Sequence, residues 1–280
     1  MLVNFKQILT MAEEGGYCIP AFNVYNLETL MGAVKAAEEL KAPCILQVYP
    51  RLMKEEVGYY LAPAVVAAAH KASVPVCFHL DHGPSELETT RSLRWGATGI
   101  MLDGSALSFE ENIALTKRVV DTCGYVDVQV EGELGHVGTV MDDSMDEFTE
   151  PSEAKVFVER TGVQALAVLV GNAHGRYKKP PKIDIQRIAD IRKATNGTAL
   201  VLHGGSGIPD EAIKEAVKAG IRKLNVATDI CYAFLDSVQE EVNKPDRMIA
   251  VDNFMKTPIE AVKEFCKTKV LLCGAEGKAK

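Results

Sequence analysis

Residues 165–170 read Ala-Leu-Ala-Val-Leu-Val and lead directly into Gly171-Asn-Ala-His-Gly175. An unbroken apolar run of this length suits a strand that is covered on both faces, as in a parallel sheet flanked by helices. The polar stretch that follows is typical of the carboxyl end of such a strand, where α/β proteins gather their chemistry. We therefore predict a buried parallel strand that delivers polar side chains at its carboxyl end.

The same alternation continues along the chain in both directions. Short apolar or β-branched runs are each followed by a longer segment with helical periodicity, which predicts parallel strands joined by helical crossovers. The eight predicted strands are residues 18–23, 44–49, 76–81, 99–103, 126–131, 165–170, 199–203 and 222–226. Eight such units favour a (β/α)8 TIM barrel, with an extra C-terminal helix, as one domain over residues 1–280. An open doubly wound sheet is the competing architecture, but no Gly-x-Gly-x-x-Gly turn follows the first strand.

The composition excludes several classes of protein. The chain has 280 residues, 47% of them apolar, and a net charge of −7 from 31 basic and 38 acidic residues. This acidic balance argues against a nucleic-acid-binding face, and no window approaches the ~18 consecutive apolar residues of a membrane span. The start of the chain has no charged segment before an apolar core. We expect a cytoplasmic protein with no nucleic-acid or membrane partner, in which seven scattered cysteines stay reduced.

Polar side chains follow most of the predicted strands. The strand ends read Asn23, His79-Leu-Asp-His82-Gly, Asp103-Gly-Ser105, Glu131-Gly-Glu133, Gly171-Asn-Ala-His174-Gly, His203-Gly-Gly-Ser206-Gly and Asn225-Val-Ala-Thr228-Asp229. A barrel brings these ends together at one mouth. The longest connection, residues 134–150, is acidic and contains glycine, as expected of a mobile lid over an active site.

Three histidines, His82, His174 and His203, come directly after three different strands. A single histidine in a loop usually only makes hydrogen bonds, but three at strand ends form a metal-site arrangement. Three neutral imidazoles that leave one position open suit catalytic Zn²⁺, and the ligand type leaves Co²⁺, Mn²⁺ and Fe²⁺ open.

Carboxylates at the neighbouring strand ends extend this predicted metal site. Glu131 and Glu133 point the same way if the fifth strand continues that far, so that one approaches the metal and the other is a buried partner. We assign Glu133 and Asp103 to the metal, and we interpret His79 as a core histidine or as a partner that supports the ligands from behind.

Asp81 directly precedes His82. It either orients that histidine or faces the cavity as a general acid and base. The remaining interpretation, that Asp81 caps the next helix, is weaker because Pro84 and Ser85 offer a better helix start.

Two helix starts indicate a phosphate site. Gly204-Gly-Ser-Gly207 and Asn225-Val-Ala-Thr-Asp229 each lead into a predicted helix. Backbone N–H groups at such starts hold phosphate. A Gly-Gly-Ser-Gly turn alone is more often a simple loop, but barrels frequently bind phosphate after the seventh and eighth strands.

Over nearly its whole length the sequence resembles the class II, metal-dependent fructose-bisphosphate and tagatose-bisphosphate aldolases. The matching segments are Pro20-Ala-Phe-Asn-Val24, Leu80-Asp-His-Gly83, Met101-Leu-Asp-Gly-Ser105, Phe109-Glu-Glu-Asn-Ile113, Glu133-Leu-Gly135, Gly171-Asn-Ala-His-Gly175, Leu202-His-Gly-Gly-Ser-Gly-Ile-Pro209 and Lys223-Leu-Asn-Val-Ala-Thr-Asp229. The resemblance implies a lyase of carbohydrate metabolism, as in glycolysis. Its substrate would be a ketose 1-phosphate or ketose 1,6-bisphosphate, cleaved reversibly to dihydroxyacetone phosphate and an aldehyde by a homodimer or homotetramer.

The resemblance also implies a role for each matching residue. His82, His174 and His203 would hold the catalytic metal, which polarises the ketose carbonyl, and Asp81 would move the proton at the C4 oxygen. Asn23 would orient the substrate. The residues implied to hold the dihydroxyacetone phosphate moiety, with a monovalent cation (Na⁺ or K⁺) near the phosphate, are Gly175, Gly204, Ser206, Asn225, Ala227 and Thr228.

The sequence departs from the family at two places. Where the family lid has Gly-Gly and two acidic residues, one of which exchanges a proton with the three-carbon unit, this chain has Thr139-Val140-Met141. We expect Asp142 or Asp143 to substitute. Where many fructose-bisphosphate members have an Arg that contacts the distal phosphate, this chain has Asp252, which would repel it. We therefore expect an unphosphorylated aldehyde half, unless Arg51 takes over the contact.

Three other functions are weaker interpretations. A metal-dependent barrel hydrolase usually has a His-x-His pair on its first strand, and this chain has none there. A Schiff-base aldolase needs a lysine inside the barrel at a carboxyl end, and Lys223 lies at a strand start. A phosphosugar-binding barrel with little or no turnover would not need the proton shuttle that Asp81 offers.

Overall fold

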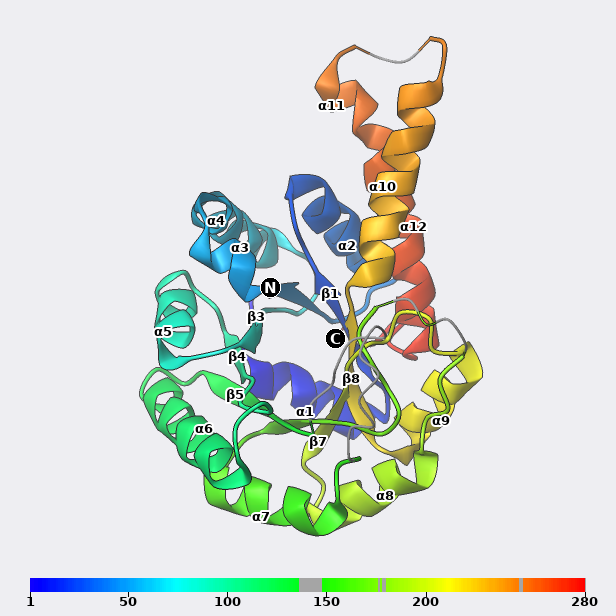
Figure 1. Cartoon of the computed structure of the whole chain (residues 1–280). Coiled ribbons are helices and arrows are strands. Elements are labelled where there is room, and N and C mark those ends of the chain that lie inside the picture. The colour runs from blue at the N-terminus through cyan, green and yellow to red at the C-terminus, as the bar shows by residue number, and fades with distance from the viewer. Residues whose placement is uncertain (136–147, 176, 178–179, 247–248, 280) are drawn as a thin grey trace.

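The computed structural model describes residues 1–135, 148–175, 177, 180–246 and 249–279. Its eight strands are all parallel and close into a barrel in chain order, with helices around it (Figure 1). The strands are β1 (Ile19–Asn23), β2 (Cys44–Val48), β3 (Val76–Gly83), β4 (Gly99–Leu102), β5 (Gln129–Leu134), β6 (Ala165–Val168), β7 (Ala199–Leu202) and β8 (Ile221–Val226). The predicted (β/α)8 TIM barrel is confirmed, and the open doubly wound sheet is excluded.

One helix precedes the barrel and the others follow its strands. They are α1 (Phe5–Gly15), α2 (Leu27–Glu39), α3 (Pro50–Lys54), α4 (Glu56–Lys71), α5 (Glu86–Arg94), α6 (Phe109–Gly124), α7 (Pro151–Thr161), α8 (Ile185–Ala194), α9 (Asp210–Ala219), α10 (Thr228–Asn243), α11 (Val251–Phe254) and α12 (Lys256–Leu272). Asn4, Asn26 and Ser108 begin their helices with capping boxes, which satisfy backbone N–H groups of the first turn. None of the helices in the described ranges is long and apolar enough to cross a membrane.

The C-terminal helices form an arm that projects from the barrel. α10 and α12 lie side by side, and α11 lies at the outer end of the pair (Figure 1). α12 also packs along α2, where Gly32 leaves room for Val262, since a Cβ on residue 32 would lie 2.6 Å from it. The predicted extra C-terminal helix is thus present. Asp252 lies in α11, away from the strand ends of its own chain.

The fifth strand differs most from its predicted range. The other strands agree with prediction to within two residues, but β5 begins and ends three residues later than expected. The prediction began the strand at Val126 because β-branched residues favour strands. In the structure Val126 lies in the turn after α6 and is 59% exposed. The shift places both Glu131 and Glu133 inside the strand, so the expectation that they point the same way is met.

Several odd-numbered strand residues place polar side chains inside the barrel. Asn23 lies level with Gln47, and Gln47 lies level with His79. Contacts between strands that are not neighbours, such as Asn23 with Asp81 at 2.7 Å, run through the barrel interior. α1 packs against the barrel at its amino end, where Phe5 lies 4.7 Å from His79 between ring centroids. His79 is fully buried, as expected.

Candidate active site and metal centre

Three imidazoles meet at the carboxyl ends of the strands. The ring centroid of His82 lies 4.9 Å from that of His174 and 4.6 Å from that of His203. One ring nitrogen of each residue lies within 4.8 Å of the others. A single divalent ion with nitrogen ligands at about 2.0–2.1 Å can bridge such a group after a small adjustment of the side chains. The donor set therefore fits a divalent metal ion.

His82 reaches the mouth because strand β3 is irregular at its carboxyl end. An even-numbered residue of this strand would face the surrounding helices, but the pairing with β4 shifts register between Leu80 and Gly83. His82 adopts a positive φ of 46°, a strained conformation for a residue other than glycine. Its backbone N–H points at Met101 Sδ, 3.3 Å away. The irregularity turns the imidazole over the barrel mouth, as bulges near functional sites often do.

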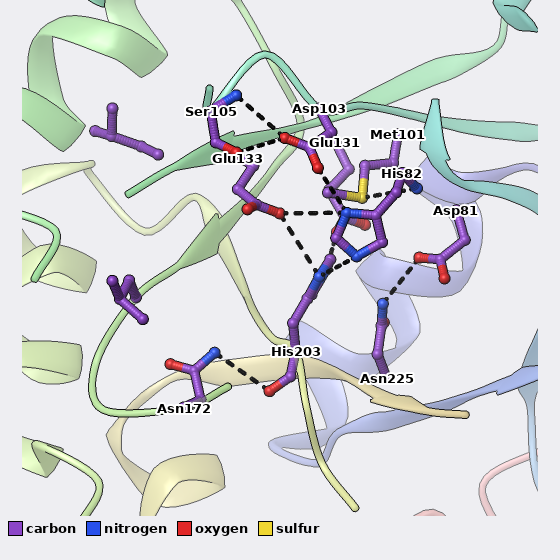
Figure 2. Close-up of polar contacts among 12 residues, drawn as sticks. Asp81, His82, Met101, Asp103, Ser105, Glu131, Glu133, Asn172, His203 and Asn225 are labelled. Carbon is purple, nitrogen blue, oxygen red and sulfur yellow. Dashed lines mark hydrogen bonds and ion pairs between the residues drawn. The ribbon is translucent and has the colours of Figure 1, made fainter. Parts of the chain in front are cut away.

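Carboxylates determine which ring nitrogens face the proposed metal position. His82 Nδ1 lies 2.8 Å from Asp103 Oδ2, and His203 Nε2 lies 2.9 Å from Glu131 Oε1. The opposite nitrogens, His82 Nε2 and His203 Nδ1, face each other at 2.9 Å (Figure 2). Asp103 is itself held by the hydroxyl and the backbone N–H of Ser105, at 2.6 and 3.1 Å. Such outer partners orient metal-binding imidazoles and fix their tautomers.

Glu133 lies between two of the histidines. Its Oε2 is 3.7 Å from His82 Nδ1 and 3.7 Å from His203 Nδ1. With His82 and Asp103 it forms a second group whose ligand atoms lie within 4.8 Å of one another. The structure thus gathers all five residues predicted for the metal site, His174 included, in one cluster.

The surroundings shift the pKa values of His82 and His203 in opposite directions. Burial by itself lowers the pKa of His82, but Asp81, Asp103 and Glu133 raise it to about 10. Burial, with His82 and Lys223 nearby, holds the pKa of His203 well below its ordinary value. In the metal-free protein at neutral pH, His82 is therefore positively charged, with both ring nitrogens protonated, and His203 is neutral, with one. Metal binding must displace the proton on His82.

Asp81 is held in place through both of its carboxylate oxygens. Asn23 Nδ2 donates to Oδ2 at 2.7 Å, and Asn225 Nδ2 donates to Oδ1 at 3.0 Å. Burial would raise the pKa of Asp81, but the charges of His82 and other neighbours lower it, so the group is ionised. The alternative role as a helix cap is excluded, because Ser85 caps α5. Asp81 is an ionised, oriented carboxylate beside the histidine cluster.

The loop after β7 is fitted closely to its neighbours. Gly204 has a φ of 64°, and a Cβ on it would lie 2.0 Å from the carbonyl oxygen of Ala173, so only glycine fits. Ser206 Oγ accepts a hydrogen bond from the backbone N–H of Asp229 at 3.2 Å. This bond joins the loop to the start of α10.

The start of α10 offers backbone N–H groups close to that loop. Ala227 is its N-cap residue, and Thr228 is its first helical residue; both are half-buried. Gly175 directly follows His174 and has a φ of 106°. The structure therefore brings all the residues predicted to bind phosphate to the ends of β6, β7 and β8, where a helix N-terminus attracts anions.

Met141, Asp142 and Asp143 lie outside the described residues, as does most of the predicted lid. Arg51 lies exposed at the rim of the mouth, with its guanidinium 5.9 Å from the ring centroid of Tyr49. The Tyr49 ring in turn lies 6.0 Å from that of His82. Arg51 is thus near the cluster, whereas Asp252 is not.

Sequence reasoning missed several polar residues around the cluster. Asn172 Nδ2 donates to the carbonyl oxygen of His203 at 3.2 Å, and Gln47 Nε2 donates to Asn23 Oδ1 at 2.9 Å. Lys223 is fully buried inside the barrel, although its place at a strand start argued against a role. Strand periodicity was the available signal, because Lys223 precedes the inward-pointing Asn225 by two residues.

Comparisons with known proteins match nearly the whole chain. Residues 3–278 match the model of the family described as fructose-bisphosphate aldolase class-II. The chain is 37% identical to the YdjI aldolase from Escherichia coli K12, with a TM-score of 0.90 over 100% of both chains. A protein from Coccidioides immitis is 28% identical, with a TM-score of 0.89 over 99% of this chain and 98% of its own. The fructose-bisphosphate aldolase from Campylobacter jejuni shares the fold. It is 23% identical, with a TM-score of 0.80 over 99% of this chain and 97% of its own.

Proposed function

Because the chain belongs to the class II fructose-bisphosphate aldolase family, we propose that it cleaves a ketose 1-phosphate to dihydroxyacetone phosphate and an aldehyde. The observation that carries this proposal is the position of Asp81. This ionised carboxylate is held by two amides immediately beside the three-histidine cluster. An oriented base next to a metal position is what retro-aldol cleavage requires.

The bond broken lies between C3 and C4 of the ketose. Asp81 accepts the proton of the C4 hydroxyl while that bond breaks, so that the C4 oxygen becomes the aldehyde carbonyl. A divalent ion held by His82, His174 and His203, with Zn²⁺ as the proposed metal, would polarise the ketose carbonyl and stabilise the negative charge that develops there. Asn23 keeps Asp81 turned toward the substrate.

The phosphate of the three-carbon unit is proposed to bind between the loop after β7 and the start of α10. Gly175, Gly204, Ser206, Asn225, Ala227 and Thr228 are the proposed contacts, with Na⁺ or K⁺ beside the phosphate. The hydrogen bond between Ser206 and Asp229 supports this location, because it holds the two segments together. A phosphate anchored here places the ketose carbonyl toward the histidines.

The last proton transfer is proposed to use the connection after β5. Cleavage leaves a carbanion equivalent on the three-carbon unit, and this carbon must take up a proton. Asp142 or Asp143 is the proposed donor in place of the family carboxylate at Met141. The support is the sequence, in which this connection directly follows Glu133, Leu134 and Gly135 at the end of β5.

The aldehyde half is proposed to carry no phosphate. It would lie along Tyr49, whose ring faces His82, and end near Arg51. Phosphate sites usually combine several charge-assisted hydrogen bonds. Among the described residues, Arg51 is exposed and no carboxylate fixes its guanidinium, so it would be a weak phosphate anchor on its own. Asp252 lies in α11, which is at the outer end of the projecting arm (Figure 1), so we propose that it does not face a phosphate bound in the same chain's site.

A Schiff-base mechanism is disfavoured by the surroundings of Lys223. Its Nζ lies 2.8 Å from Glu131 Oε2 and donates to Asn225 Oδ1 at 2.7 Å. An ion-paired, fully buried ammonium cannot attack a ketose carbonyl.

We further propose that residues 1–280 act as one domain in a cytoplasmic homodimer or homotetramer that serves carbohydrate metabolism. Two features support this. All seven cysteines lie within the described ranges and none is in a disulfide, as expected in a reducing compartment. The projecting arm exposes Leu235 and Val251, at 58% and 68%, which a second subunit would cover.

The decisive experiment compares the wild type with Asp81→Asn. Dihydroxyacetone phosphate released from singly phosphorylated ketoses is measured in a coupled assay at equal zinc loading. We expect Asp81→Asn to abolish cleavage while zinc and substrate still bind. A wild-type protein that binds ketose phosphates but releases no product would instead be a binding barrel.

A further inference from the structure

A buried lysine near the histidine cluster, Lys223, contacts the polar side chains of two residues. Lys223 lies in the middle of β8, with no exposure to solvent. Its Nζ lies 2.8 Å from Glu131 Oε2 on β5 and 2.7 Å from Asn225 Oδ1 on its own strand. Both partners are themselves buried inside the barrel.

The contact to Glu131 leads to the proposed metal. Because the ammonium of Lys223 takes Oε2, the other carboxylate oxygen, Oε1, is directed at His203 Nε2, 2.9 Å away. That contact keeps the proton of His203 on Nε2 and leaves Nδ1 toward His82.

The contact to Asn225 leads to the proposed base. An amide has one oxygen and one NH₂ group, so the lysine that occupies Oδ1 forces the NH₂ group to point the other way. There Nδ2 donates to Asp81 Oδ1 at 3.0 Å. The orientation of one carboxylate oxygen of Asp81 is therefore set through Asn225.

Lys223 also supplies the charge that Glu131 needs. A buried carboxylate is costly unless it is paired. His79 Nε2 lies 3.5 Å from Glu131 Oε2, but burial and the charge of Lys223 hold the pKa of His79 well below its ordinary value, so this ring is neutral. Among the described residues, Lys223 is the cation that faces Glu131 at hydrogen-bonding distance.

We propose that Lys223 is a positioning residue that sets two parts of the site at once: the imidazole that His203 offers to the metal, and the carboxylate that Asp81 offers to the substrate. The first branch runs from Lys223 through Glu131 to His203. The second runs from Lys223 through Asn225 to Asp81. Only the second branch rests on the proposed aldolase reaction.

The test uses Lys223→Met, Glu131→Gln and the double variant. Lys269→Met on α12 is the matched control, since Lys269 is also buried, at 8% exposure, but lies outside the barrel interior. Removing one partner of a buried pair destabilises a protein, whereas replacing both is often tolerated. Circular dichroism checks that each variant folds. If Lys223→Met does not fold, the double variant is compared with Glu131→Gln in its place.

The first readout is metal binding, which needs no enzymatic activity. Zinc affinity is measured by competition with a chromophoric chelator, and the ligand geometry is followed in the visible spectrum of the Co²⁺-substituted protein. We expect Lys223→Met and Glu131→Gln each to weaken zinc binding about 10- to 100-fold and to alter the Co²⁺ spectrum. The double variant should bind zinc no more weakly than Glu131→Gln, because both changes act through one contact. Wild-type affinity and spectrum in the double variant would overturn the first branch.

The second readout is cleavage at saturating metal. Lys223→Met should lower kcat more than Glu131→Gln does, because only Lys223→Met also releases Asn225 and Asp81. For Lys223→Met, the change in KM should be smaller than the change in kcat. Equal effects on kcat would overturn the second branch. A wild-type protein that cleaves no ketose phosphate would instead refute the proposed function, and the metal-binding arm would still test Lys223.

Discussion

Asp103 holds the imidazole of His82 by a contact of 2.8 Å between Oδ2 and Nδ1, and this contact turns His82 Nε2 toward His203. The backbone of His82 is in the left-handed region, so the position of this histidine depends on the groups packed around it. The metal site is therefore built as much by the partners of its histidines as by the histidines themselves.

Replacing Asp103 with asparagine should weaken zinc binding about 10- to 100-fold, because the partner that directs His82 Nε2 is lost. Asp121→Asn is the control, since Asp121 is an exposed residue of α6 that pairs with Lys117. Competition titration with a chelator measures both. Equal zinc affinity in the two variants would show that Asp103 does not orient His82.

The metal-free protein should lose stability as the pH rises. The folded protein raises the pKa of His82 to about 10, above its ordinary value of about 6.5. The resulting stabilisation is complete below the unfolded value and is lost between the two values. His203 adds nothing in this window, because its lowered pKa affects stability only on the acid side. Thermal unfolding with a chelator present, across this pH range, measures the effect.

Zinc binding should release about one proton per ion at neutral pH, since His82 must lose its proton to become a ligand. Calorimetric titration in buffers of different ionisation enthalpy reports this number. A binding enthalpy that does not change with the buffer would contradict the assigned charge of His82.

The chain should prefer ketose 1-phosphates to ketose 1,6-bisphosphates in kcat/KM, because Arg51 alone is a weak anchor for a second phosphate. Arg51→Ala should lower kcat/KM for a bisphosphate several-fold and leave the value for an uncharged aldehyde half within about twofold. Cleavage of fructose or tagatose 1,6-bisphosphate as efficient as that of a committed enzyme would reverse this assignment.

One of Asp142→Ala and Asp143→Ala should slow the exchange of the C3 proton of dihydroxyacetone phosphate with solvent. General acid–base groups typically contribute about 10²- to 10⁴-fold. Deuterium incorporation followed by NMR measures the exchange without a second substrate. If neither variant slows it, the idea that these residues replace the family carboxylate is wrong.

The barrel and the three-histidine cluster could be predicted from the sequence because both depend on local patterns. His82, His174 and His203 could be placed together, since parallel strands in a barrel end at one mouth. The position of Glu133 followed from strand periodicity, although the strand boundary was predicted three residues too early.

Features that depend on packing across the barrel could not be read in the same way. The role of Lys223 requires the pairing of β5 with a residue from β8, which no local pattern contains. The place of Asp252 in α11, at the outer end of the arm, depends on how α10 and α12 project from the barrel (Figure 1), which alignment with the family's arginine does not reveal.

The most direct test of the aldolase assignment is the release of dihydroxyacetone phosphate from a panel of ketose phosphates by one protein sample. The sample is assayed as purified, after removal of metal by a chelator, and after zinc is restored. We predict cleavage that disappears with the chelator, returns with zinc and is strongest on singly phosphorylated ketoses. Cleavage that survives complete metal removal, or no cleavage of any ketose phosphate by the zinc-loaded protein, would contradict it.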